Sequence, residues 1–140
     1  MKILLAIDGS IYTKRMLAYL AAHDELLGPE RRYTVLHAVA ALPPHVTGHV
    51  GHGIVEDHYQ AEARKVIEPV LAFARQHDWT VDVQTPVGRA ADLVAEVANA
   101  GRYDLVVMGS HGNTPLTSVV LGSVAQRVIA QSEVPVLIVP

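Results

Sequence analysis

The sequence contains no cysteine, which excludes disulfide bonds, thiolate catalysis and cysteine-ligated zinc. Histidine remains as the soft metal ligand. No apolar run approaches the ~20 residues needed to cross a bilayer, and the apolar run after Met1 is too short for a signal peptide. These absences favour a soluble cytoplasmic protein.

Positive charge is also scarce. The chain has 11 Lys and Arg against 14 Asp and Glu, and its formal net charge is −3. Its basic residues are scattered rather than gathered on one face, so direct nucleic-acid binding is not expected. Half of the residues are hydrophobic, which argues against disorder. A chain of 140 residues is long enough for a proper core, and we expect one domain spanning residues 1–140.

What is present is an alternation of strand-like and helix-like periods. Short strand-like runs predict strands at 3–7, 33–39, 80–84, 105–108 and 134–139. Apolar residues at helical spacing predict helices at 13–27, 56–76 and 90–98, and a further helix that opens at Gly122-Ser123. The alternation predicts an α/β fold: a Rossmann-like, open, five-stranded parallel sheet with helices on both faces.

The sequence also predicts one loop, one helix kink and the buried face of one helix. Residues 40–53, rich in Pro, Gly and His, are expected to form a loop. Pro69 is expected to interrupt or kink the second helix. The inward face of the last helix is expected to carry four apolar residues, Val124, Ala125, Val128 and Ile129.

A glycine pattern near the C-terminus is the most informative local feature. Gly109 and Gly112 follow the apolar run 105–108, and Gly122 opens the last helix. Because helix N-termini present unpaired N–H groups and a partial positive charge, phosphate oxygens could bind at Gly122, Ser123 and Val124. The alternative is structural: Gly109 and Gly122 would serve turns, and Ser123 would cap its helix.

Three predicted strand ends bring further groups to the same place. Asp8, Val39 and Gly109 each fall at the C-terminal end of a predicted strand, where parallel α/β sheets bind ligands at a switch in strand order. The Asp8 carboxylate can accept from a ribose hydroxyl or a base amine, or assist a phosphate-bound metal; it can also cap the turn at Gly9-Ser10. The convergence predicts a nucleotide site.

At these residues the chain resembles the universal stress protein family. Four segments carry the resemblance: Ala6-Ile7-Asp8-Gly9-Ser10, Val106-Val107-Met108-Gly109-Ser110, Leu121-Gly122-Ser123-Val124-Ala125 and Pro135-Val136-Leu137-Ile138-Val139. The spacing Gly109-x2-Gly112-x9-Gly122-Ser123 is similar to the signature of the family's ATP-binding branch. The resemblance covers the whole chain and implies an adenine nucleotide alpha hydrolase-like fold and a role in stress response.

The resemblance also implies how ATP would lie. Adenine would lie near Asp8 and the backbone at Val39, and the ribose near Asp8 and Gly109. The phosphates would contact Gly109, Gly112, Gly122, Ser123 and Val124. A divalent ion, Mg²⁺ or Mn²⁺, would be held mainly by the phosphates.

The chain departs from the family pattern in its charge. The family often carries Arg where His111 stands and further basic residues between Gly112 and Gly122, whereas this chain has none there. Charge-assisted hydrogen bonds are about twice as strong as neutral ones, so the affinity for a triphosphate is expected to be modest. Thr114, Thr117 and Ser118 are neutral donors in this segment. His111 is either a solvated loop residue or, when protonated, a group that strengthens binding as the pH falls.

No catalytic residue is predicted. The sequence lacks a G-x-x-x-x-G-K-[ST] lysine and a supported nucleophile and base pair, so slow ATP hydrolysis at most is expected. The favoured function is a nucleotide-dependent regulatory switch.

Two histidine patterns indicate alternative functions. His49-Val50-Gly51-His52 matches the H-x-G-H pattern of nucleotidyl transferases, which would indicate adenylyl transfer, but the pattern follows the second strand instead of the first. His45, His49, His52 and His58 could form a metal site; a solvated loop, or a pH-sensitive lid over the crevice, is the alternative.

The last strand suggests an assembly. The run that begins at Val134 and ends at Val139 is apolar, and Pro135 suits a sheet edge. Because an exposed edge invites aggregation, we expect this strand to pair with its copy across a two-fold axis in a homodimer. A dimeric partner-binding module that uses no nucleotide is therefore the alternative function.

Overall fold

The computed structural model describes residues 1–113 and 120–140 of the chain. The elements in order are β1 (Lys2–Ala6), α1 (Ile11–Ala22), the 3-10 helix η1 (Asp24–Leu27), β2 (Arg32–Leu36), α2 (Pro44–Thr47), α3 (His52–Gln76), β3 (Val81–Gln84), α4 (Ala90–Ala100), β4 (Leu105–Gly109), α5 (Ser123–Gln131) and β5 (Val136–Val139).

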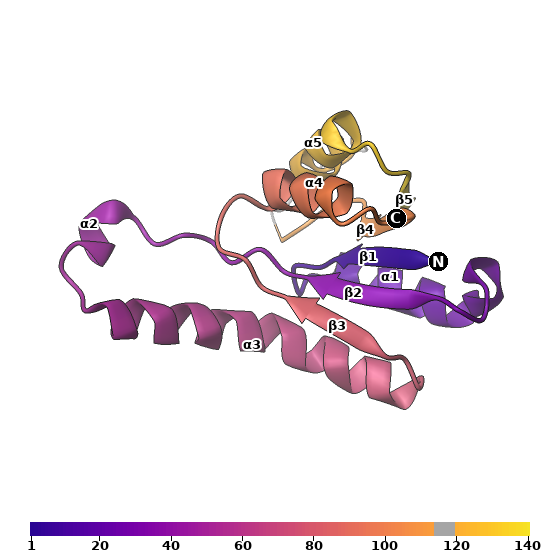
Figure 1. The fold of residues 1–140 in the computed structure, drawn as a ribbon, viewed down its shortest axis with the longest axis horizontal. Coiled ribbons are helices and arrows are strands. Elements are labelled where there is room, and N and C mark those ends of the chain that lie inside the picture. The colour runs from indigo at the N-terminus through magenta and orange to yellow at the C-terminus, as the bar shows by residue number, and fades with distance from the viewer. Residues whose placement is uncertain (114–119) are drawn as a thin grey trace.

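The strands form one parallel sheet in the order β3-β2-β1-β4-β5. Helices α1 and α3 cover one face, and α4 and α5 cover the other (Figure 1). The predicted α/β class, the five-stranded parallel sheet and the single domain are confirmed. The chain moves outward from β1 to β3 and then returns to the other side of β1 as β4, so the switch in strand order lies between β1 and β4.

The core follows from alternation along the strands, since successive side chains of a strand point to opposite faces. Ile3 and Leu5 of β1 pack in a cluster with Met16 of α1 and Ile67 of α3. Leu4, between them, joins a second cluster with residues of α4 and α5. All three β1 residues are fully buried, as expected of a strand covered on both faces.

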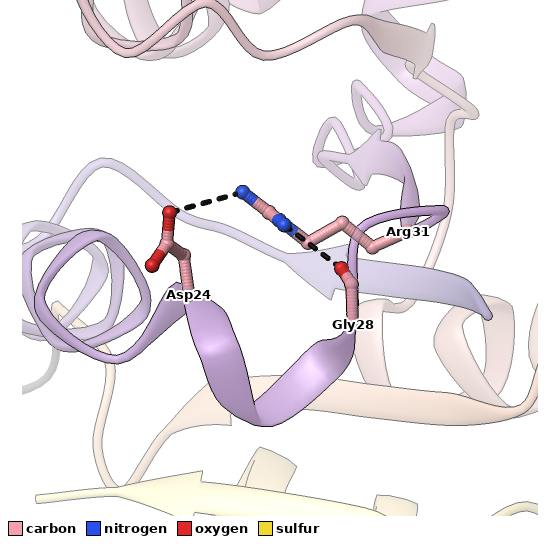
Figure 2. Close-up of polar contacts among 3 residues, drawn as sticks. All are labelled: Asp24, Gly28 and Arg31. Carbon is pink, nitrogen blue, oxygen red and sulfur yellow. Dashed lines mark hydrogen bonds and ion pairs between the residues drawn. The ribbon is translucent and has the colours of Figure 1, made fainter.

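The first predicted helix, 13–27, is an α-helix followed by a separate 3-10 helix in the structure. Helix α1 begins earlier, at Ile11, because Ser10 caps it by accepting from the Tyr12 N–H. It ends at Ala22, and η1 follows up to Gly28, whose φ of 77° suits glycine. Figure 2 shows how Arg31 braces this turn by donating to the Gly28 carbonyl and to Asp24.

The predicted loop 40–53 contains helix α2 and the beginning of α3. Pro44 occupies the first position of α2, where its missing N–H costs nothing, and α3 starts at His52 instead of 56. Helix α2 and the first turns of α3 project beyond the C-terminal ends of the strands (Figure 1). Pro69 lies inside α3 without ending it.

Several other predicted boundaries and faces shift. β5 begins at Val136, since the Val134 N–H bonds to the Ser132 hydroxyl in a preceding turn. It lies at the edge of the sheet, as predicted. β2 ends at Leu36. In α5, Ala125 and Val128 are buried, but Val124 and Ile129 are exposed, so the predicted inward face was too wide.

Thr114, Thr117 and Ser118, the neutral donors expected near a triphosphate, lie outside the described residues. Within residues 1–113 and 120–140, none of the helices combines the length and hydropathy that crossing a membrane requires.

Candidate functional site

The turn after β1 fixes Asp8 at the switch point. One carboxylate oxygen of Asp8, Oδ1, accepts from the Ser10 N–H at 2.9 Å and from the Thr13 hydroxyl at 3.0 Å. Gly9 has a φ of 79°, a conformation that side-chain-bearing residues rarely adopt. Asp8 therefore does cap this turn, and hydrogen bonds from the start of α1 hold its carboxylate in position.

The segment after β4 crosses directly over Asp8. A Cβ atom on Gly112 would lie 2.7 Å from Asp8 Oδ2, so a larger residue here would force the carboxylate to move. Asn113 donates from its side-chain amide to the Asp8 carbonyl at 3.0 Å. Gly109 is explained differently: a Cβ there would lie 2.6 Å from the Tyr12 Cβ, so it allows α1 to pack against β4.

Hydrogen bonds close the other end of this segment onto its beginning. The Gly122 N–H donates to the Ser110 carbonyl at 2.8 Å. The His111 ring contacts the Ser110 hydroxyl through Nδ1 and the Val120 carbonyl through Nε2, at 2.9 and 2.6 Å. Because a carbonyl only accepts, Nε2 carries the hydrogen of that bond. Residues 110–111 and 120–122 are thus tied together.

Helix α5 begins at this closure and presents unpaired donors. Its N-cap is Gly122, which offers no side-chain cap, so the alternative role of Ser123 as a helix cap is wrong. Ser123, Val124 and Ala125 occupy the first turn, and their N–H groups donate to no acceptor in the described part of the chain. An uncapped helix N-terminus favours an anion.

These groups surround a cavity of about 520 Å³, within the size range of small-molecule sites. Six of the seven predicted site residues line it: Asp8, Gly109, Gly112, Gly122, Ser123 and Val124. Apolar walls come from Ile7 and Leu36 on the strand ends and from Val94 on α4. The cavity thus combines an apolar wall, a carboxylate and a helix N-terminus.

Val39 is the predicted site residue that does not line the cavity. It is buried, its N–H donates to the Pro86 carbonyl, and its carbonyl accepts from the Gly88 N–H. Its neighbour Ala38 lines the cavity instead. Strand alternation explains the difference, since adjacent residues face opposite ways.

Sequence reasoning missed other lining residues. Ala90 reaches the wall because α4 begins there, Asn113 directly follows Gly112, and Gln126 lies in the first half of α5. The Gln126 amide donates to the Leu121 carbonyl at 2.5 Å. Asn113 could have been found, because it directly follows Gly112; no sequence signal identified the amide of Gln126.

The histidines on α2, on α3 and between these two helices do not lie at the cavity. His45 is on α2, His52 and His58 are on α3, and His49 lies between these helices. None of these four lines the cavity, and the described residues hold no group of three His, Asp or Glu side chains placed to bind a metal. The structure therefore does not bring the H-x-G-H pattern to the cavity that Gly109, Gly112 and Gly122 line.

Both a family model and a curated relative that resemble this chain belong to the universal stress proteins. A model of the universal stress protein family matches residues 1–140. The Thermus aquaticus "universal stress protein in QAH/OAS sulfhydrylase 3'region" is 32% identical over 140 residues, which are 98% of this chain and 96% of the relative.

Solved structures share the fold. That of the protein MJ0577, from Methanocaldococcus jannaschii, has a TM-score of 0.81 at 26% identity and covers 99% of this chain and 94% of its own. A universal stress protein from Archaeoglobus fulgidus, solved in complex with dAMP, has a TM-score of 0.70 at 23% identity and covers 100% and 98%.

Proposed function

This chain belongs to the universal stress protein family, and from that premise we propose that it binds an adenine nucleotide in the cavity between β1, β4 and α5. Its role would be that of a nucleotide-dependent regulatory protein in stress response. One observation carries the proposal: the uncapped N-terminus of α5 opens onto the same cavity as Asp8 and Gly112. The dAMP complex of the Archaeoglobus fulgidus protein supports it.

The proposed pose follows the chemistry of the wall. The phosphates bind near the glycines Gly109, Gly112 and Gly122 and the N–H groups of Ser123 and Val124. Asp8 Oδ2, for which the described residues provide no hydrogen-bond donor, accepts from the ribose. The base lies toward Ala38 and Leu36. Val39 acts indirectly, because its backbone bonds fix the strand end that carries Ala38.

ATP is the nucleotide that the glycine signature favours, together with Mg²⁺ or Mn²⁺. Among the described residues that line the cavity, Asp8 is the one carboxylate, and no group of three suitable side chains is present in the described chain. A divalent ion would thus be held mainly by the phosphates, whose charge it would neutralise.

The chain's own residues bind and orient the nucleotide, and none is assigned as a base for hydrolysis. A partner protein would detect bound nucleotide at the surface beside the cavity, where the lining residues Val120 and Val124 are exposed (58% and 38%). A ligand that contacts α5 and β4 at once stabilises one arrangement of this surface over others, which is the basis of a switch.

A dimeric partner-binding module that needs no nucleotide is the second candidate. The observation that favours it is the position of β5 at the edge of the sheet, where its outer backbone groups would pair with a second copy. Homodimer formation is compatible with both functions.

The test combines mass spectrometry of nucleotide released from the denatured protein with calorimetry using AMP, ATP–Mg²⁺ and GMP. Adenine nucleotides are expected to bind and GMP to bind more weakly. Gly122→Val would place its side chain 3.1 Å from the Ser110 carbonyl oxygen, so it is expected to abolish binding and leave the dimer intact. Absence of released nucleotide and of binding heat would leave the partner-binding module as the function.

A further inference from the structure

Three methionines carry all the sulfur of this chain, because the sequence contains no cysteine. Met1 is 52% exposed, whereas Met16 is fully buried in the core that α1 and α3 cover. Met108 is 5% exposed and lines the cavity, which neither of the other two does. The three side chains therefore differ in how a small reagent can reach them: from solvent, not at all, or through the cavity.

Strand pairing places Met108 on the floor of the cavity. Met108 of β4 is the register partner of Ala6 on β1, and Ala6 is the partner of Leu36 on β2. Register partners in parallel strands point to the same face of the sheet, and all three residues line the cavity. Beneath the floor, Met108 belongs to one apolar cluster with Leu4 and Ala125. The thioether thus lies beside Leu36, toward which the base of the nucleotide is proposed to lie.

The reagent that a thioether meets under oxidative conditions is hydrogen peroxide, a molecule little larger than water that fits a cavity of about 520 Å³. A lone pair of the sulfur attacks one peroxide oxygen, the O–O bond breaks, and the products are the sulfoxide and water. The sulfur is oxidised by two electrons and the peroxide is reduced by two. The product is polar where the side chain was apolar, and methionine sulfoxide reductases return it to the thioether.

A sulfoxide at Met108 would oppose nucleotide binding. The side chains of Ala6 and Leu36 offer no hydrogen-bond donor to the new oxygen, and burying an unpaired polar group is costly. A base lying on this floor would bury the oxygen, so the oxidised protein binds the nucleotide more weakly. By the reciprocity of linked equilibria, a bound nucleotide covers the sulfur and opposes its oxidation.

Resting on the adenine-nucleotide function proposed above, we propose that Met108 is a sulfoxidation site controlled by nucleotide occupancy. Hydrogen peroxide oxidises Met108 in the ligand-free protein, a bound adenine nucleotide protects it, and the oxidised cavity binds nucleotide more weakly. Oxidation would therefore hold the protein in its ligand-free state until the sulfoxide is reduced.

The deciding experiment exposes the whole chain to hydrogen peroxide with and without AMP and follows each methionine by peptide mass spectrometry. Met1 should oxidise quickly in both samples and Met16 slowly in both, so they serve as internal references. Met108 is expected to oxidise faster than Met16 without AMP, and at least about tenfold more slowly at roughly a hundred times the Kd of AMP, where few molecules are ligand-free. Equal Met108 rates in the two samples, or a Met108 rate no faster than that of Met16 without AMP, would overturn the inference.

Calorimetry with AMP on the same preparation separates the inference from the function on which it rests. If AMP bound and Met108 were not protected, the inference would be wrong although the nucleotide function stood. If AMP did not bind, the proposed function itself would fail, and the inference would fall with it.

The affinity for AMP after peroxide treatment gives a second test. Treatment is expected to weaken binding at least about fivefold for the wild type. The same loss is expected for the control Met16→Leu, whose substitution lies outside the cavity. Met108→Leu, which keeps an apolar side chain of similar volume, is expected to show no loss on treatment. Equal losses in the two variants would contradict a role for Met108; the mapping of the wild-type methionines decides the matter if a variant does not fold.

Discussion

The His111 Nε2 atom lies 2.6 Å from the Val120 carbonyl oxygen, so one imidazole joins the two described ends of the segment between β4 and α5. The same ring packs against Tyr12 of α1, with centroids 5.1 Å apart. His111 therefore links the switch point, the first helix and the start of α5, and the shape of the candidate site depends on it.

His111→Ala is expected to weaken AMP binding about fivefold, because it removes the bond that closes the segment onto α5. The loss corresponds to about 1 kcal/mol, the net value of a typical hydrogen bond. Calorimetry measures the affinity, and urea unfolding measures the stability. His23→Ala is the control, since the His23 ring also bonds a carbonyl, that of Tyr19 on α1, but does not line the cavity. Equal effects of both variants on affinity would show that His111 has no special role.

Gly112→Ala is expected to reduce AMP affinity at least about tenfold. The added Cβ would lie 2.7 Å from Asp8 Oδ2, and the carboxylate cannot easily turn away because Ser10 and Thr13 hold its other oxygen. Gly53→Ala is the control: a Cβ there meets nothing within 4 Å, so binding should persist and stability should rise by up to about 1 kcal/mol. Unaltered AMP binding by Gly112→Ala would argue against a ligand at this position.

Tyr33→Phe is expected to leave stability unchanged or raise it by up to about 1 kcal/mol. The buried Tyr33 hydroxyl has no hydrogen-bond partner in the described structure, and removing an unsatisfied polar group relieves its desolvation cost. Tyr103→Phe is the matched control, because its buried hydroxyl donates to Thr34 at 3.0 Å and its loss should cost about 1 kcal/mol. Urea unfolding of both variants gives the comparison, and a larger loss for Tyr33→Phe would contradict the expectation.

The same residue predicts a pH dependence. Burial raises the pKa of Tyr33 above its usual 10.0, and the nearby Arg31 partly opposes the shift. The unfolded chain releases this proton near pH 10 while the folded chain retains it, so the stability contribution is complete below that pH and declines as pH rises toward the folded pKa. Unfolding measured between neutral and alkaline pH should show a decline that Tyr33→Phe reduces. An identical decline in both proteins would contradict the assignment.

Edge pairing of β5 predicts a dimer that a charge on that edge disrupts. Sedimentation at dilute concentration is expected to show a dimer for the wild type and a monomer for Val136→Lys, because lysine on an edge strand opposes strand pairing. Val83→Lys makes the same change on β3, the opposite edge of the sheet, and is expected to stay dimeric. A monomeric wild type, or dissociation by Val83→Lys alone, would exclude pairing through β5.

Much of the architecture could be predicted from the sequence. All five strands were predicted; the central strand β1 was identified by a short apolar run, as expected of a strand covered on both faces, whereas the edge strand β3 carries polar residues and is largely exposed. Asp8 and Gly109 were predicted to meet because parallel strand ends share one edge of the sheet. Residues more than 100 positions apart in the sequence, Asp8 and Gly109, could thus be placed at one cavity.

Other features depend on contacts that no local pattern encodes. The need for glycine at 109 comes from Tyr12, and at 112 from the Asp8 carboxylate, so the glycines were located correctly but their physical reasons could not be known. Whether Ala38 or Val39 faces the cavity depends on strand alternation past the end of β2. The helical turns in 44–53 were missed because Pro and Gly commonly mark loops, although Pro44 was a valid start signal for a helix.

The central claim is that the backbone at the start of α5 binds a nucleotide phosphate, and a pair of substitutions at Ser123 tests it most directly. Ser123→Ala removes the hydroxyl and keeps the N–H, whereas Ser123→Pro removes both. Proline is favoured at the first helical position, and Gly122, with φ −61° and ψ 156°, already has the extended conformation required before proline. Calorimetric titration with AMP should show binding at least about tenfold weaker for Ser123→Pro than for Ser123→Ala. Equal affinities of the two variants would contradict a phosphate at the N-terminus of α5.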